Sequence, residues 1–174
     1  MEIQSKPLFA LFCALLPILT GCSQIAVPPP VIPAGPSDFS SLDRAPIVRI
    51  VDGDTVRIQL NGEEMPVRLI GVDTPETVHP QKPVEEFGKE AALFLESLLK
   101  GEEVWLEYDP ANKTDRYGRL LAYLYRVPDG LNVNLEIIRQ GYGHALLSYP
   151  HPYLDDYREM GRRARMLNKG LYAE

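Results

Sequence analysis

Two alternating stretches joined by Asn61-Gly62 restrict the possible folds of this chain more than any other feature. Apolar residues occupy every second position of residues 56–60 and again of residues 65–69. A period of two indicates a strand with one buried face. Asn-Gly favours a two-residue turn because both central positions need a positive φ. The sequence therefore predicts an antiparallel hairpin over residues 56–69.

This hairpin should bring two acidic turns together. Residues 52–55, Asp-Gly-Asp-Thr, lead into its first strand, and residues 73–76, Asp-Thr-Pro-Glu, follow its second strand. Asp54 would then lie beside Asp73, with Glu76 as a third candidate carboxylate. Carboxylates that converge in a folded domain repel one another unless a cation lies between them. The Asp-Gly-Asp turn alone is more simply explained as a loop, but the pair of turns favours a cation site.

Arg68 lies at the end of the second strand, shortly before Asp73. A guanidinium presents a planar fork that matches two phosphate oxygens, whereas a hard cation takes oxygen ligands. An anion-binding group beside a cation site suggests metal-assisted phosphoryl chemistry. The simpler alternative is a strand that ends in a salt-bridged turn, and residues 68–76 alone do not decide between the two.

A second candidate site is the sequence Asp-Arg-Tyr-Gly-Arg at residues 115–119, directly before a β-favouring run at residues 120–125. Arg119 would direct a second guanidinium at phosphate, and Tyr117 would donate its hydroxyl. The alternative is a solvated hairpin loop. Further along the chain, Tyr149 could either stack on a base or pack in the core. The histidines have no metal-ligand spacing, and we assign them no catalytic role.

Apolar residues at helical spacing predict helices over about residues 84–100, 134–140 and 152–167. We expect Asn134 to cap the second helix and Gly141 to end it. The third helix carries arginines and acidic residues together, so its surface is either cationic or a solvated face.

The N-terminal residues resemble a bacterial lipoprotein signal peptide. Lys6 precedes an apolar run over residues 7–19, which is short for a membrane span and contains a proline. The run ends in Leu-Thr-Gly-Cys, which is similar to a lipobox. In lipoproteins that cysteine, here Cys22, is lipidated and becomes the mature N-terminus, and Ser23 would favour sorting to the outer membrane. The alternative is an uncleaved N-terminal anchor with an incidental cysteine.

We therefore expect three segments: a signal peptide at residues 1–21, a lipid-anchored, proline-rich linker at residues 22–45 and one folded domain at residues 46–174. A proline-rich segment cannot bury a core and favours an extended spacer. The net charge of −6 is unusual for a protein that binds nucleic acid. A polyanion site must therefore be formed by local cations or a bound metal. Nothing in the sequence indicates an obligatory protein partner.

Three motifs together resemble the staphylococcal nuclease (thermonuclease) family: Val-Asp-Gly-Asp-Thr at residues 51–55, Arg-Leu-Ile-Gly-Val-Asp-Thr-Pro-Glu at residues 68–76, and the arginine motif at residues 115–119. The resemblance covers residues 46–172 and is specific because all three motifs occur in order. It implies a mainly β fold, a five-stranded OB-fold barrel with three α-helices. It also implies an endonuclease that hydrolyses phosphodiester bonds in DNA and RNA with Ca²⁺.

The resemblance assigns roles by position. Asp54 and Asp73 resemble the calcium carboxylates, and Thr74 would add its backbone carbonyl. Glu76 resembles the residue that positions or deprotonates the attacking water. The remaining assignments are two guanidiniums on the scissile phosphate, Arg68 and Arg119, and four substrate-binding residues, Lys82, Arg116, Tyr117 and Tyr149. Leu147 departs from the family, which often has an aromatic residue at that position.

The resulting hypothesis is an exported, lipid-anchored, calcium-dependent nuclease whose domain lies outside the cytoplasm. One alternative is a non-catalytic OB-fold module that binds nucleic acid, which would usually lack the acids or the arginines. Another is a scaffold lipoprotein of the envelope, which would not need converging carboxylates. The presence of all the acids and arginines favours the enzyme.

Overall fold

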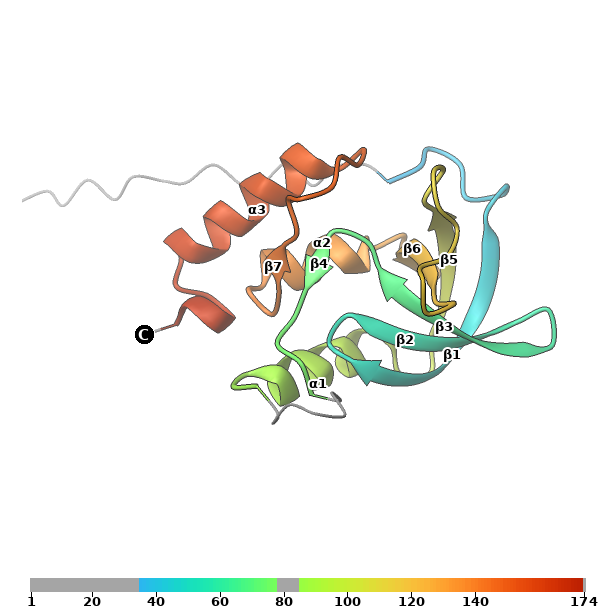
Figure 1. Ribbon diagram of the computed structural model, residues 1–174, viewed down its shortest axis with the longest axis horizontal. Coiled ribbons are helices and arrows are strands. Elements are labelled where there is room, and N and C mark those ends of the chain that lie inside the picture. The colour runs from blue at the N-terminus through green and yellow to red at the C-terminus, as the bar shows by residue number, and fades with distance from the viewer. Residues whose placement is uncertain (1–34, 78–84, 174) are drawn as a thin grey trace, which may run out of the picture.

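The computed structural model describes residues 35–77 and 85–173, and within them five strands form a closed barrel (Figure 1). The order around the barrel is β1-β2-β3-β6-β5, and β5 pairs back with β1. All neighbouring strands are antiparallel except β3 and β6, which are parallel. The barrel strands are β1 (Asp43–Asp52), β2 (Thr55–Leu60), β3 (Glu63–Leu69), β5 (Glu103–Tyr108) and β6 (Leu120–Arg126). The predicted five-stranded barrel is confirmed.

Strands β2 and β3 form the predicted hairpin. Asn61 and Gly62 both have positive φ angles, of 52° and 85°. Val56 lies opposite Val67 in the ladder, and both side chains are completely buried. The alternating pattern and the turn therefore set the register that they predicted.

The folded part of the chain includes residues that the composition assigned to the linker. Strand β1 begins at Asp43, before the domain start expected at residue 46, and its first residues pair with β5. Phe39 precedes the strand and stacks on Trp105 with 4.5 Å between the ring centroids. Such aromatic stacking buries apolar area and helps to hold this segment against the barrel.

Three helices pack around the barrel in the described residues: α1 (Gly88–Leu99), α2 (Val133–Arg139) and α3 (Leu154–Met166). Helix α1 packs against β1, and α2 packs against both β6 and α3. All three lie within or close to the ranges that the helical spacing predicted. No helix in residues 35–77 or 85–173 combines the length and the apolar character that a membrane crossing requires.

The predicted cap of α2 is wrong. Asn132 is the N-cap residue, and its side-chain oxygen accepts a hydrogen bond from the backbone N–H of Leu135. Asn134 lies inside the first turn and is completely buried, with its amide bonded to other elements. Gly141 follows the end of the helix with a φ of 77°, as expected of a residue that terminates it.

The arginines of α3 form a solvated, ion-paired face. Arg158 pairs with Asp155, and Arg162 and Arg163 both pair with Glu159. Arg162 and Arg163 lower the pKa of Glu159 to about 2, chiefly through the hydrogen bond from Arg162. The cations of this helix are therefore partly neutralised by its own acidic residues.

A second, two-stranded sheet lies between the barrel and α3 (Figure 1). It consists of β4 (Val72–Asp73) and β7 (His144–Ala145), which pair with Asp73 opposite His144. This sheet holds the acidic turn that follows β3 against the C-terminal part of the domain.

Candidate active site

The hairpin brings the two acidic turns together, as the sequence predicted. Thr55 at the start of β2 lies opposite Arg68 at the end of β3. The backbone N–H of Leu69 donates to the carbonyl of Asp54 over 2.9 Å. The backbone N–H of Thr74 donates to Oδ2 of Asp54 over 3.2 Å. The turn before β2 is therefore bonded directly to the turn after β3.

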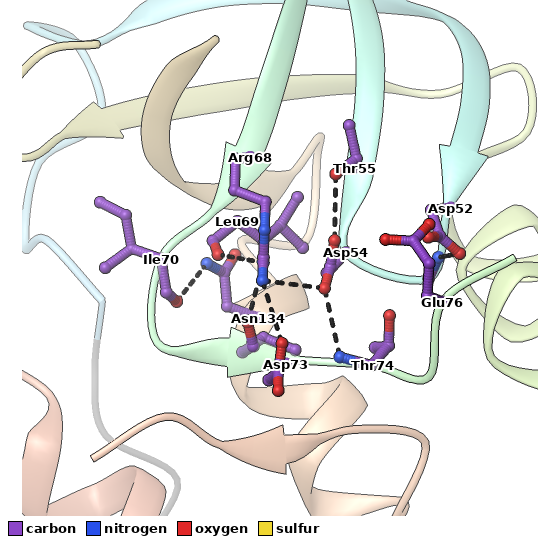
Figure 2. A network of polar contacts seen from close by, with 12 residues as sticks. Asp52, Asp54, Thr55, Arg68, Leu69, Ile70, Asp73, Thr74, Glu76 and Asn134 are labelled. Atoms are coloured by element: carbon purple, nitrogen blue, oxygen red, sulfur yellow. Dashed lines mark hydrogen bonds and ion pairs between the residues drawn. The ribbon is translucent and has the colours of Figure 1, made fainter. Parts of the chain in front are cut away.

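The Arg68 guanidinium lies between the two predicted metal-binding carboxylates (Figure 2). One of its terminal nitrogens is 3.0 Å from Oδ2 of Asp54 and 3.4 Å from Oδ1 of Asp73. The other donates to the backbone carbonyls of Leu69, over 3.0 Å, and Val72, over 2.8 Å. Both carboxylates therefore converge on one position, which a positive group occupies.

The two carboxylates differ in environment. The Asp54 side chain is 9% exposed, whereas that of Asp73 is 59% exposed. Burial raises the pKa of Asp54, and the Arg68 guanidinium acts in the opposite direction. The Thr55 hydroxyl also donates to Asp54 over 3.0 Å. A buried, well-anchored acid is thus paired with a solvent-accessible one.

Glu76 is separate from this pair. It lies beside Asp52 in Figure 2, and the next residue, Thr77, donates its hydroxyl to Asp52 over 2.7 Å. The backbone N–H of Glu76 donates to Glu85 over 3.1 Å. Within the described residues, no three acidic, histidine or cysteine side chains are grouped closely enough to hold a metal ion. The third candidate carboxylate therefore does not join the other two here.

The available donors fit a hard cation. Asp54 and Asp73 supply carboxylate oxygens, and Thr74 connects the two turns through its backbone. The Thr74 hydroxyl is buried and has no hydrogen-bond partner among residues 35–77 and 85–173. Oxygen-only donors with two carboxylates are the ligands that Ca²⁺ prefers.

The second guanidinium is positioned by its own loop. Arg119 donates from Nε to Oδ2 of Asp115 over 2.7 Å. Oδ1 of Asp115 accepts the backbone N–H groups of Tyr117, over 2.9 Å, and Arg119, over 3.0 Å. Burial raises the pKa of Asp115, but these hydrogen bonds outweigh it and leave the pKa below its ordinary value. The role of Asp115 was not predicted, although its place at the start of a tight loop is typical of such turns.

The parallel pairing of β3 with β6 places the two predicted phosphate-binding arginines in one pocket. Arg68 lies opposite Leu121, which is two residues after Arg119. The pocket has a volume of about 610 Å³, and its lining includes Arg68, Arg116 and Arg119 together with Tyr149. The lining does not include Asp54 or Glu76. Arg68 therefore lies between the acidic turns on one side and the pocket on the other.

The two predicted nucleotide-contacting tyrosines are accessible. Tyr149 is 68% exposed, so the alternative of core packing is wrong for this residue. Tyr117 is also 68% exposed, and its hydroxyl accepts a hydrogen bond from Arg116 over 2.7 Å. The Arg116 and Arg119 guanidiniums lie 4.8 Å and 5.5 Å from the centre of the Tyr117 ring. These contacts are within the range of cation–π interactions.

Two predicted functional residues, Lys82 and Cys22, lie outside the described residues. The same holds for the predicted signal peptide at residues 1–21 and for the beginning of the linker. Their assignments therefore remain predictions.

Comparisons with known proteins identify relatives of this chain. A family model described as staphylococcal nuclease homologue matches residues 66–174. The thermonuclease of Staphylococcus hyicus is 38% identical over 128 residues, which are 73% of this chain and 74% of that protein. The thermonuclease of Staphylococcus intermedius is 42% identical over 119 residues, 68% of this chain and 67% of that protein. Endonuclease YncB of Bacillus subtilis (strain 168) is 37% identical over 120 residues, 68% of this chain and 54% of that protein.

Proposed function

The chain belongs to the staphylococcal nuclease family, and from this premise we propose that it is a calcium-dependent nuclease that hydrolyses phosphodiester bonds in DNA, in RNA or in both. The observation that carries the proposal is the position of Arg68. This guanidinium lies between an oxygen-rich acidic pair and a pocket that contains a second arginine. Cation-binding and phosphate-binding groups thus lie next to each other.

The proposed cation ligands are the carboxylates of Asp54 and Asp73 and the backbone carbonyl of Thr74. When bound there, Ca²⁺ would supply positive charge to the phosphate oxygens and hold exchangeable water. The chain prepares this position by anchoring Asp54 through the Thr55 hydroxyl and the Thr74 N–H before any ligand arrives. Asp73 remains accessible to solvent, which gives a cation a route of entry.

The proposed phosphate ligands are Arg68 and Arg119. Phosphodiester hydrolysis builds negative charge on the phosphate oxygens, so fixed guanidiniums stabilise the transition state more than the ground state. Each is held by other groups: Arg68 by two backbone carbonyls and Arg119 by Asp115. Holding the charges in place beforehand removes much of the reorganisation that water would require.

The attacking water is assigned to Glu76, which would orient it or remove its proton. Glu76 lies on the same turn as Asp73 and Thr74, only a few residues further along the chain. The substrate-binding assignments are Tyr149, which would stack on a base from the wall of the pocket, and Arg116 and Tyr117 on the neighbouring loop. Lys82 is proposed to contact the substrate as well.

We also propose that the protein is exported and anchored through a lipid on Cys22. The sequence support is the apolar run, the Leu-Thr-Gly-Cys tetrapeptide and the proline-rich spacer that follows. Ser23 favours the outer membrane. The nuclease domain would then lie outside the cytoplasm, attached to the membrane through the spacer.

The direct test is cleavage of single-stranded DNA by the purified protein in Ca²⁺ and again after addition of a chelator. We expect cleavage in Ca²⁺ and none after chelation. When Arg68→Ala is assayed in the same way, Arg162→Ala is the control for general loss of positive charge, because Arg162 lies on the ion-paired face of α3. Absence of cleavage in Ca²⁺, or cleavage that persists unchanged in the chelator, would refute the proposed activity.

A further inference from the structure

The turn formed by Ile70 and Gly71 lies between the phosphate-binding and cation-binding groups. Arg68 precedes the turn at the end of β3, and Asp73 follows it in β4. Arg68 also binds the backbone carbonyls on the two sides of the turn, those of Leu69 and Val72. Any displacement of the turn would therefore move the guanidinium and the carboxylate relative to each other.

Asn134 attaches this turn to the barrel (Figure 2). Its side-chain amide donates to the carbonyl of Ile70 over 3.0 Å and to the carbonyl of Ala122 over 3.2 Å. Its side-chain oxygen accepts the backbone N–H of Leu124 over 3.0 Å. One completely buried side chain from α2 thus joins the turn to strand β6, in addition to the backbone hydrogen bond that the N–H of Ile70 donates to the carbonyl of Ala122 over 3.1 Å.

The opposite side of the turn is fixed by packing. Gly71 has a φ of 75°, and a Cβ atom placed there would lie 2.7 Å from the ring of Tyr157. The carbonyl of Gly71 accepts the backbone N–H of Leu146 over 2.9 Å. The turn is therefore confined between α3 and β6, and the Ile70 carbonyl in its centre is bound by Asn134.

We propose that Asn134 is a positioning residue for phosphodiester cleavage. It fixes the Ile70–Gly71 turn and thereby sets the separation of the Arg68 guanidinium from the carboxylates of Asp54 and Asp73. This inference rests on the proposed nuclease function. Asn134 does not contact the substrate, and its effect is transmitted through the Ile70 carbonyl.

The geometry predicts an effect on turnover that exceeds the effect on substrate binding. Small misplacements of reacting groups are costly, and a shift of about 1 Å can lower a rate by about 10²-fold. Asn134→Ala removes the hydrogen bonds to Ile70, Ala122 and Leu124. It leaves Arg116 and Tyr149, which lie on other segments of the pocket wall. We expect kcat to fall by about tenfold and KM to change by less than about twofold.

The experiment measures kcat and KM of the full chain on a single-stranded oligonucleotide in Ca²⁺, at a temperature where circular dichroism shows each variant to be folded. The variants are Asn134→Ala and Asn134→Ser, and the serine hydroxyl retains one donor at the site. The kcat of the serine variant should lie between those of the wild type and the alanine variant. Ile138→Val, a core change on the same helix toward α3, is the control and should retain the wild-type values.

A double-mutant cycle with Arg68→Ala separates positioning from general destabilisation. If Asn134 acts through the turn that follows Arg68, Asn134→Ala should lower kcat much less in the Arg68→Ala background than in the wild type. Equal losses in both backgrounds, or an unchanged kcat in the folded variants, would overturn the inference. If Asn134→Ala does not fold, the serine variant provides the same comparison. An inactive wild type would overturn the proposed function and this inference together, whereas an active wild type with unaffected variants overturns the inference alone.

Discussion

Removal of the Asp115 carboxylate, which anchors Arg119, tests whether preorganisation of this guanidinium contributes to the rate of cleavage. Asp115→Asn keeps an oxygen that can accept the backbone N–H groups of Tyr117 and Arg119, so the loop should remain folded. It removes the charge that binds Nε of Arg119 at 2.7 Å. The perturbation is therefore confined to the ion pair.

The expected effect on stability is small. The Asp115 and Arg119 side chains are 16% and 32% exposed, so solvent partly screens their attraction. Ion pairs of this kind typically contribute about 1 kcal/mol or less to the free energy of unfolding. The pair therefore cannot account for a large loss of activity through unfolding.

The expected effect on catalysis is larger. Complete loss of one electrostatic donor in an active site costs roughly 10²–10³-fold in kcat. Asp115→Asn retains the arginine but releases it, so we expect kcat/KM to fall by about tenfold, equivalent to about 1.4 kcal/mol in the activation free energy. Oligonucleotide cleavage and urea unfolding of the same preparations measure the two effects separately.

A matched control exists at the other end of β6. Asp129 holds Arg126 through a bond of 2.6 Å and accepts a loop N–H in the same way, but neither residue lines the pocket. Asp129→Asn should cost similar stability and leave cleavage unchanged. Wild-type cleavage activity in Asp115→Asn, or an equal loss of cleavage activity in Asp129→Asn, would refute the role of Asp115 in positioning Arg119.

The pH dependence gives an additional readout of the same pair. The pKa of Asp115 in the folded protein is below its ordinary value, so the stabilisation is complete at neutral pH. It is lost as the pH falls below about 3.9, the usual pKa of aspartate, and through the folded value. The difference in unfolding free energy between wild type and Asp115→Asn should therefore be constant at neutral pH and shrink in acid. A difference that grows in acid would contradict the assignment.

Three further predictions concern Arg68, Gly71 and the lipid anchor on Cys22. Arg68→Ala should lower kcat by roughly 10²–10³-fold in the cleavage assay, and an unchanged rate would remove this residue from the site. Gly71→Ala should destabilise the domain in urea unfolding by about 2–5 kcal/mol, because its positive φ costs about 1–2 kcal/mol and overpacking against Tyr157 adds about 1–3 kcal/mol. Gly101 has a similar φ but open space around it, so Gly101→Ala should lower the free energy of unfolding only by the contribution of the positive φ. Equal losses of stability in the two variants would refute the clash with Tyr157. Cys22→Ala should release the protein from the membrane fraction, and unchanged fractionation would count against lipidation.

The sequence predicted the parts of the fold that depend on local patterns. The period of two and Asn61-Gly62 identified the hairpin, and its register brought Asp54 to the residues after Arg68. Helical spacing located the helices that pack on the barrel. These features depend on neighbours in the sequence, so a single chain carries enough information to recognise them.

Features that depend on distant contacts were not predictable in this way. Local propensity favoured Asn134 as a helix cap, but its amide bonds with the carbonyl of Ile70, which is far away in the sequence. The composition near Phe39 indicated a linker, and only the contact with Trp105 shows why the segment is folded. The ion pairs of Arg68 with both carboxylates depend on the closed barrel and the small second sheet. In each case, tertiary contacts override the local preference.

The most direct test of the account is the dependence of the cleavage rate on Ca²⁺ concentration in the wild type and in Asp73→Asn. The Asp73 side chain is largely exposed, so this substitution should leave the fold intact while removing one proposed ligand charge. We predict that the Ca²⁺ concentration for half-maximal activity rises by about tenfold or more in Asp73→Asn, with Asp129→Asn unchanged. Coincident activation curves for Asp73→Asn and the wild type would contradict a cation site at the acidic turns beside Arg68.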